Sequence, residues 1–160
     1  MAERLRMTVP LGPSTAAAEP LDGSRPLDPA SDREGLARLM LAAYRGTVDD
    51  EGETEDDAIA AIDMLLAGEF GAYDDEATEV VERDGAIVAA TLLTAWEGGP
   101  FIAFSMTDPG HQRQGLARGG LLRAMARLAA RGEPRLDLVV TAANDRAVAL
   151  YRSLGFAERA

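Results

Sequence analysis

The segment of residues 110–117, Gly-His-Gln-Arg-Gln-Gly-Leu-Ala, constrains the fold of this chain more than any other. It follows an apolar run, residues 101–107, that ends at Asp108-Pro109, where proline removes a backbone donor and stops strand pairing. From Leu116 onward, apolar residues recur at helical spacing. The segment therefore predicts a turn from a strand into a helix. Small residues at Gly115 and Ala117 would let a ligand approach the backbone closely.

A turn of this kind is suited to a phosphate group. The first N–H groups of a helix have no intrahelical partner and carry the positive end of its dipole. Arg113 and Arg118 add positive charge nearby. A P-loop fits less well because Leu116 stands where that loop needs lysine, and no G-x-G-x-x-G fingerprint joins a strand to a helix. The turn predicts a pyrophosphate site, and the alternative is an ordinary loop that enters an arginine-rich surface helix.

A second pattern lies about thirty residues later. Residues 135–138 alternate between charged and apolar side chains, and residues 138–140 are all apolar, which predicts a strand over 135–141. Asn144 can cap the helix that follows. Gly155 is a natural end for that helix. The helix has one largely apolar face, made of Ala147, Leu150, Tyr151 and Leu154. This pattern predicts a short helix that presents a tyrosine beside the phosphate turn.

Together the two patterns resemble the acyl-CoA-binding half of the GCN5-related N-acetyltransferase (GNAT) family. The family pattern of Gln or Arg, two residues, Gly, one residue, Gly or Ala is met by Gln112, Gly115 and Ala117. The family signature of Asn, Ala, Tyr and Leu-Gly-Phe is met by Asn144, Ala147, Tyr151 and residues 154–156. The resemblance implies an α/β fold of the acyl-CoA N-acyltransferase type, with a mixed central sheet flanked by helices.

The resemblance also implies a reaction, the transfer of an acetyl group from acetyl-CoA to a primary amine by direct attack. Tyr151 would be the acid that protonates the departing thiolate, and its alternative is a tyrosine of the core. The residues expected to contact acetyl-CoA are Ser105, Thr107, Gln112, Arg113, Gln114, Gly115, Leu116, Ala117, Arg118 and Asn144. The alternative function is a non-catalytic module with the same fold that binds or senses acyl-CoA.

The general base is left open by the sequence. In many relatives a carboxylate on the strand before the phosphate turn has this role, but residues 101–107 contain none. Glu79, Glu82, Asp108 and the carboxylates of residues 46–57 remain candidates that would act through water. The single histidine, His111, is expected to be structural or to contact the cofactor.

Charge is distributed unevenly along the chain. Residues 1–109 carry a balance of −16 and residues 110–160 a balance of +5, which fits a ligand with several phosphates on the basic side. Seven carboxylates lie between Asp49 and Asp57, and they predict a cationic acceptor, a small amine or a peptide, held by Asp49, Asp50 and Glu51. Alternatively these carboxylates only solvate a loop and start a helix. We expect no metal, because the run lacks EF-hand spacing, and no nucleic acid, because the chain is acidic overall.

The 160 residues predict one domain with a real core, since 47% of them are hydrophobic. The sequence has no cysteine, which excludes disulfides and thiolate chemistry. No apolar run approaches the roughly 20 residues that span a membrane, and residues 1–4 are not followed by an apolar stretch like that of a signal peptide. We therefore expect a cytoplasmic protein without a membrane partner.

We expect a loose arm over residues 1–24, apart from a strand-like piece at 5–9, and an acetyltransferase domain over 25–160. Within the domain we predict a short strand at 25–27, helices that start at Ser31 or Asp32 and at Thr54, and strands at 78–82 and 86–96 joined by a turn at 84–85. The order β–α–α–β–β–β–α–β–α matches the family. A further strand is expected after Phe156, where four residues remain, so either the sheet is one C-terminal strand short or residues 5–9 fill the slot. They would come from the same chain or from the partner in a homodimer.

Overall fold

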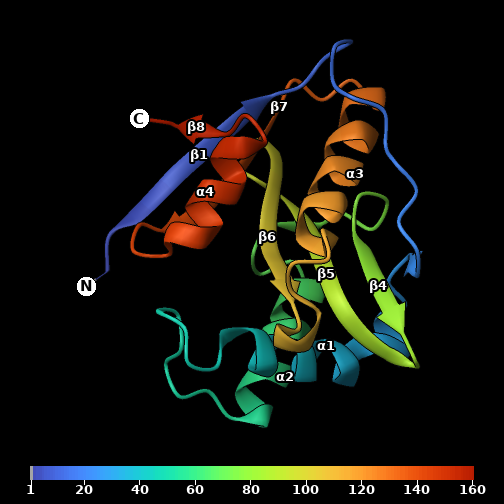
Figure 1. Ribbon diagram of the computed structural model, residues 1–160, viewed down its shortest axis with the longest axis vertical. Helices are drawn as coiled ribbons and strands as arrows, with labels where there is room; N and C mark the ends of the chain where they lie inside the picture. Colours follow the sequence, from blue (N-terminus) through green and yellow to red (C-terminus); the bar gives the residue numbers. More distant parts are fainter. Residues whose placement is uncertain (1) are drawn as a thin grey trace.

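A computed structural model describes residues 2–160 of the chain (Figure 1). The elements in chain order are β1 (Arg4–Pro10), β2 (Ser24–Arg25), α1 (Pro29–Tyr44), α2 (Glu55–Leu66), β3 (Ala72–Tyr73), β4 (Glu79–Arg83), β5 (Ala86–Trp96), β6 (Gly99–Thr107), a 3-10 turn at Pro109–His111, α3 (Leu116–Ala130), β7 (Arg135–Thr141), α4 (Asp145–Ser153) and β8 (Ala157–Glu158). The predicted α/β class with a mixed sheet flanked by helices is confirmed.

The sheet has the strand order β2-β4-β5-β6-β7-β1-β8, and β3 pairs with β5. Each neighbouring pair is antiparallel except β6 and β7, which are parallel. That parallel pairing comprises only Phe101 with Asp137 and Ile102 with Leu138. Past these residues β6 continues to Thr107 and β7 to Thr141 without pairing with each other, so the two strands diverge. Figure 1 shows β6 running toward α1 and α2, away from α4 and β1.

The N-terminal strand belongs to the sheet. β1 pairs with β7 along its whole length, from Arg4 opposite Thr141 to Pro10 opposite Arg135, and Met7 on it is fully buried. Of the alternatives that the sequence left open, the structure shows residues 5–9 of the same chain within the sheet, and the short β8 pairs with the outer side of β1. The sheet therefore has a C-terminal strand, although a very short one.

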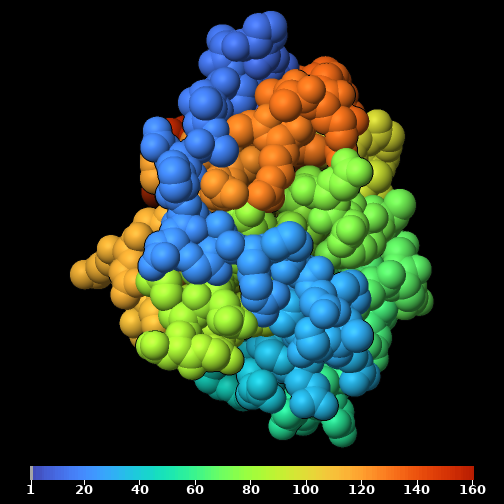
Figure 2. Space-filling model, turned by 90° about the vertical axis from the view of Figure 1, so that its right-hand side faces the viewer, coloured from blue at the N-terminus to red at the C-terminus, as the bar shows by residue number. Residues whose placement is uncertain are grey.

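Residues 1–24 were expected to form a loose arm apart from the strand-like piece at 5–9, and in the structure the segment after β1 lies against the domain. The Leu11 N–H donates to the Pro134 carbonyl at 2.9 Å, and Arg123 Nη1 donates to the Glu19 carbonyl at 2.9 Å. The Leu21 side chain lies against Gly119 of α3. Figure 2 shows the blue arm running over orange α3 toward lime β4. All of these contacts join residues far apart in the sequence, so the local composition of the segment gave no sign of them.

Helices cover both faces of the sheet. α1 and α2 enclose one core, with Leu36, Ile62 and Leu92 among its buried members. α3 and α4 pack over the other, with Leu121, Val148 and Leu93 among its buried members. Among the described residues no helix is both long and apolar enough to cross a membrane.

The helix starts were predicted in part. α2 begins as expected with a capping box between Thr54 and Asp57. α1 begins earlier than expected, because Asp28 accepts hydrogen bonds from the backbone at its start and a proline occupies its first position, so neither Ser31 nor Asp32 is the cap. Asp32 instead turns inward and binds Arg25 at 2.7 Å.

The hairpin between β4 and β5 is confirmed, and Asp84 and Gly85 both have positive φ, 51° and 80°, at its turn. The short first strand lies at Ser24–Arg25 rather than at 25–27. The two-residue strand β3 gave no period-2 signal that could have predicted it, because two residues are too few.

Candidate active site

The N-terminus of α3 is open to a ligand. Gly115 occupies its cap position with φ 74°, and no side chain caps it, whereas side chains of Asp28, Thr54 and Asn144 cap α1, α2 and α4. A Cβ atom placed on Gly115 would meet nothing within 4 Å. The first N–H groups of α3 therefore remain available to an anion, as the sequence predicted.

A cavity of about 380 Å³, the turn cavity, lies beside this helix start. Most residues predicted to contact the cofactor line it, namely Ser105, Thr107, Gln112, Arg113, Gly115, Leu116, Ala117, Arg118 and Asn144. Gln114 is not among the lining residues. His111 is, and its Nδ1 lies 3.1 Å from Asp108 Oδ2, an arrangement that holds the turn together. Two hydrogen bonds join this turn to α4. Arg146 Nη1 donates to Gln112 Oε1, and Arg118 Nη1 donates to Ser153 Oγ.

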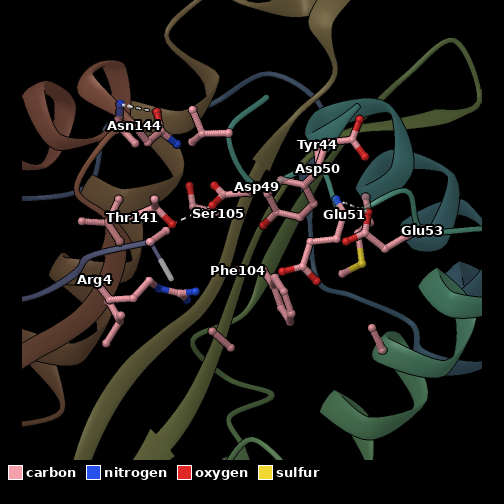
Figure 3. Close-up of a pocket in the computed structure, with 18 of the residues that line it drawn as sticks. Arg4, Tyr44, Asp49, Asp50, Glu51, Glu53, Phe104, Ser105, Thr141 and Asn144 are labelled. Atoms are coloured by element: carbon pink, nitrogen blue, oxygen red, sulfur yellow. Dashed lines mark hydrogen bonds between the residues drawn. The ribbon is translucent and has the colours of Figure 1, made fainter. Parts of the chain in front are cut away.

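A second cavity of about 400 Å³, the acidic cavity, lies between the loop after α1, the diverging strands and α4. Its lining combines apolar side chains such as Met40, Ala58 and Phe104 with five carboxylates. These carboxylates are Asp49, Asp50, Glu51, Glu53 and Asp57, so the residues predicted for the acceptor lie together here. Figure 3 shows Asp50, Glu51 and Glu53 on one side of this space and Arg4 and Thr141 on the other.

The two cavities meet where β6 and β7 diverge. The residues that line both are Tyr44, Asp49, Ser105, Asn144, Ala147 and Tyr151. We call this set the junction. A molecule in the turn cavity and a molecule in the acidic cavity would face each other across it. The sequence predicted Ser105, Asn144 and Tyr151 on one side and Asp49 on the other, and the fold brings them together.

Tyr151 has the chemistry of a proton donor. Its ring packs edge-on against Phe156 with the centroids 5.8 Å apart. Burial raises the pKa of its phenol above the usual 10.0, the interaction with Ser105 lowers it, and the negative charge of Asp49 raises it further. Because burial dominates, Tyr151 keeps its proton over the neutral and mildly alkaline range.

Tyr44 is a residue of the junction that the sequence reasoning missed. Burial raises the pKa of its phenol strongly, and the charges of Tyr151 and Asp49 raise it further. The signal that could have found it is its position as the last residue of α1, directly before the loop of residues 45–54 that carries most of the acidic run. Arg4 and Thr141 were also missed as lining residues. They enter the site only because β1 and β7 pair, with Arg4 opposite Thr141.

Three carboxylates that the sequence left open as bases are engaged elsewhere. Glu79 binds Arg123 at 2.6 Å and also pairs with Arg127. Glu82 binds Arg25 at 3.0 Å. Asp108 accepts from the Gly110 N–H at 2.9 Å. None of the three is among the residues that line the two cavities. The carboxylates that do line the cavities come from the loop after α1 and, for Asp57, from the first turn of α2.

Comparison with known proteins gives one family. The model of the acetyltransferase (GNAT) family matches residues 36–156. A curated relative, the ribosomal protein bS18-alanine N-acetyltransferase of Escherichia coli K12, is 51% identical over 51 residues, which are 32% of this chain and 34% of that protein. The match therefore spans about a third of the length of that relative.

Solved structures share the fold. A GCN5-related N-acetyltransferase from Sphaerobacter thermophilus aligns with 98% of this chain and 48% of its own at a TM-score of 0.76 and 20% identity. The ribosomal-protein-S18-alanine N-acetyltransferase from Escherichia coli aligns with 88% of this chain and 80% of its own, at a TM-score of 0.67 and 24% identity. The yncA protein from Salmonella typhimurium was solved with its cofactor acetyl-CoA. It aligns with 82% of this chain and 77% of its own, at a TM-score of 0.59 and 22% identity.

Proposed function

Because the chain belongs to the acetyltransferase (GNAT) family, we propose that it transfers the acetyl group of acetyl-CoA to a primary amine. The observation that carries this proposal is the junction, where a cavity with an open helix N-terminus meets a cavity rich in carboxylates beside a protonated tyrosine. A donor with phosphates and an acceptor with positive charge would each find complementary surroundings.

The turn cavity fits acetyl-CoA. The pyrophosphate would lie on the first N–H groups of α3, where Gly115 leaves space, with Arg113 nearby. The pantetheine arm would lie along β6 past Ile102, where that strand no longer pairs with β7. Thr107 supports this placement, because its Oγ1 is buried without a hydrogen-bond partner among the described residues. A ligand along the strand would supply one.

The acidic cavity fits the amine. Its carboxylates would attract an ammonium group, and its apolar lining would hold a short aliphatic body. We propose a small cationic molecule or a peptide amine as the acceptor. The curated relative bears the name of an enzyme that acetylates an alanine of a ribosomal protein. A peptide with N-terminal alanine is therefore one reasonable acceptor for this chain.

Tyr151 would protonate the sulfur that leaves the acetyl group. The phenol lies at the junction and its raised pKa keeps the proton available. General acids of this kind contribute about 10²- to 10⁴-fold to the rate. Asn144 would act mainly through α4, because its side chain accepts a hydrogen bond from the Ala147 N–H at 3.2 Å and caps the helix that carries Tyr151.

The test is an assay of free thiol released from acetyl-CoA with a panel of acceptors: a peptide with N-terminal alanine, spermidine, and neutral amino acids. We expect acetylated product, identified by its mass, with at least one cationic acceptor. Calorimetry should show acetyl-CoA binding in the absence of acceptor. If acetyl-CoA binds and no amine in the panel is acetylated, the chain is better described as a non-catalytic acyl-CoA-binding module.

A further inference from the structure

One carboxylate of the acidic cavity differs from the others in position. Of the five that line this cavity, Asp49 also lines the turn cavity. It is therefore the carboxylate at the place where donor and acceptor would meet. The following inference rests on the proposed function and concerns the proton that the acceptor must lose.

Three of the other four carboxylates that line this cavity hold the local backbone in shape. Asp50 accepts from the N–H groups of Gly46 at 2.8 Å and Gly52 at 2.9 Å. Glu53 accepts from the Glu51 N–H at 3.1 Å. Asp57 accepts from the Thr54 N–H at 2.8 Å and completes the capping box. These bonds explain why an acidic loop is needed here, and they leave a different role for Asp49.

Asp49 is held from outside its own loop. Thr141 Oγ1, on the last residue of β7, donates to Asp49 Oδ1 at 2.6 Å, and Thr141 is 5% exposed. This bond joins residues 92 positions apart and fixes the carboxylate over the gap between β6 and β7. Oδ2 makes no hydrogen bond with a described residue, so it can face the acceptor. Figure 3 shows Asp49 between Ser105 and Tyr44, with Thr141 close by.

We propose that Asp49 is the proton acceptor of the reaction, directly or through one water, and that Thr141 is its positioning residue. Asp49 takes one proton from the ammonium of the acceptor. The nitrogen lone pair then forms the bond to the acetyl carbon, and the carbon–sulfur bond breaks. Tyr151 gives its proton to the departing sulfur and regains one from the new amide nitrogen. Asp49 releases its proton to solvent, so one proton leaves per turnover.

The electrostatic surroundings agree with this geometry. The charge of Asp49 raises the pKa of both Tyr44 and Tyr151, so the carboxylate lies close to the acid that it would complement. Charged and titratable groups from several elements line the same space: Arg4 of β1, Tyr44 of α1, Arg45 after it, Tyr151 of α4, and Asp50, Glu51, Glu53 and Asp57.

The test compares Asp49→Asn with Asp56→Asn, which removes the same charge from an exposed residue outside both cavities. Each variant is assayed with the best cationic acceptor and with an analogue whose amine carries a neighbouring fluorine, so that it is uncharged at the assay pH. We expect Asp49→Asn to lower kcat on the order of 10²-fold with the ammonium acceptor and much less with the uncharged analogue. The affinity for acetyl-CoA by calorimetry should be unchanged.

Thr141→Val keeps the shape of the side chain and removes the hydrogen bond to Asp49. We expect it to lower kcat in the same acceptor-dependent way, though less than Asp49→Asn, and to leave acetyl-CoA binding intact. If Asp49→Asn changes only KM, or lowers kcat equally with both acceptors, Asp49 is not the proton acceptor, while the acetyltransferase function stands. If the wild-type protein acetylates neither acceptor, both the function and this assignment are overturned.

Discussion

Tyr151 is held by its neighbours in the sequence as well as by the fold. Asn144 caps the helix before it, Gly155 ends the helix with φ 97°, and Phe156 packs against its ring. These contacts involve the backbone and the aromatic ring rather than the phenol oxygen. The side chain can therefore lose its hydroxyl without loss of the helix.

We predict that Tyr151→Phe lowers kcat on the order of 10²-fold, because the acid that protonates the leaving sulfur is removed. Steady-state kinetics with the best acceptor measures this, and calorimetry should show an unchanged affinity for acetyl-CoA. Tyr73→Phe is the matched control, because Tyr73 lies outside both cavities and should keep full activity. Wild-type turnover in Tyr151→Phe would make Tyr151 a packing residue only.

Sequence reasoning found residues whose role is set locally. Asn144 as a cap, Gly115 at the helix start and Gly155 at a helix end each follow from the backbone that their neighbours form. It missed Tyr44 and Thr141, whose roles come from contacts across the fold. No periodicity within one helix or strand encodes a hydrogen bond between Thr141 and a loop residue 92 positions away.

At the scale of elements, the start of α3 carries the prediction for the cofactor. Gly115→Glu places bulk and negative charge where the pyrophosphate would lie, and should abolish acetyl-CoA binding by calorimetry. Gly132→Glu is the matched control, because Gly132 lies just beyond the other end of α3, also has positive φ, 86°, and also has open space around a Cβ. Both variants carry the same backbone strain, so equal loss of binding would show that α3 does not hold the pyrophosphate.

The strand β1 is predicted to be part of the folding unit. Met7 is fully buried in the core shared by α3, α4 and the sheet. Met7→Ala should lower the free energy of unfolding by about 2–5 kcal/mol, the usual cost of removing a buried side chain of this size. Denaturant unfolding measures this, with the exposed Val48→Ala expected to change stability by less than about 0.5 kcal/mol. Equal stabilities would mean that β1 does not belong to the cooperative core.

The order of helices and strands could be predicted from periodicity and caps, but the place of β1 could only be proposed. The pattern of residues 5–9 is that of a strand, and nothing in it specifies a partner. Its pairing with β7 depends on the register of two segments more than a hundred residues apart. The same holds for the divergence of β6 from β7, which creates the site and has no local signal.

On the scale of the whole molecule, the acidic and basic parts of the sequence partly neutralise each other. Glu79 binds Arg123 and Arg127, and Asp74 binds Arg131 at 2.6 Å. These arginines therefore hold α3 against the strand β4 and the segment before it, and their charge is not available to a ligand. The arginines that line the turn cavity are Arg113, Arg118 and Arg146, and in the proposed function these would supply positive charge for the cofactor.

The remaining negative charge around the acidic cavity predicts how the acceptor binds. We expect Asp50→Asn combined with Glu51→Gln to raise KM for a cationic acceptor roughly 3- to 10-fold at low salt, since each removed charge weakens the attraction modestly. The difference from wild type should shrink as salt screens the charges. Asp49 is kept, so kcat should change little, and acetyl-CoA affinity should stay the same.

The control for this double variant is Glu55→Gln combined with Asp56→Asn, which changes the net charge equally at two exposed residues that line neither cavity. If KM rises equally in both pairs, the acceptor responds to the overall charge of the protein and not to Asp50 and Glu51 in particular. If KM is unchanged in the first pair at low salt, neither carboxylate guides the acceptor, and Asp50 serves to shape the loop through its hydrogen bonds to the N–H groups of Gly46 and Gly52. A rise confined to Asp50→Asn/Glu51→Gln would place the positive charge of the acceptor beside Asp50 and Glu51. These two residues directly follow Asp49, the carboxylate proposed to take the acceptor's proton.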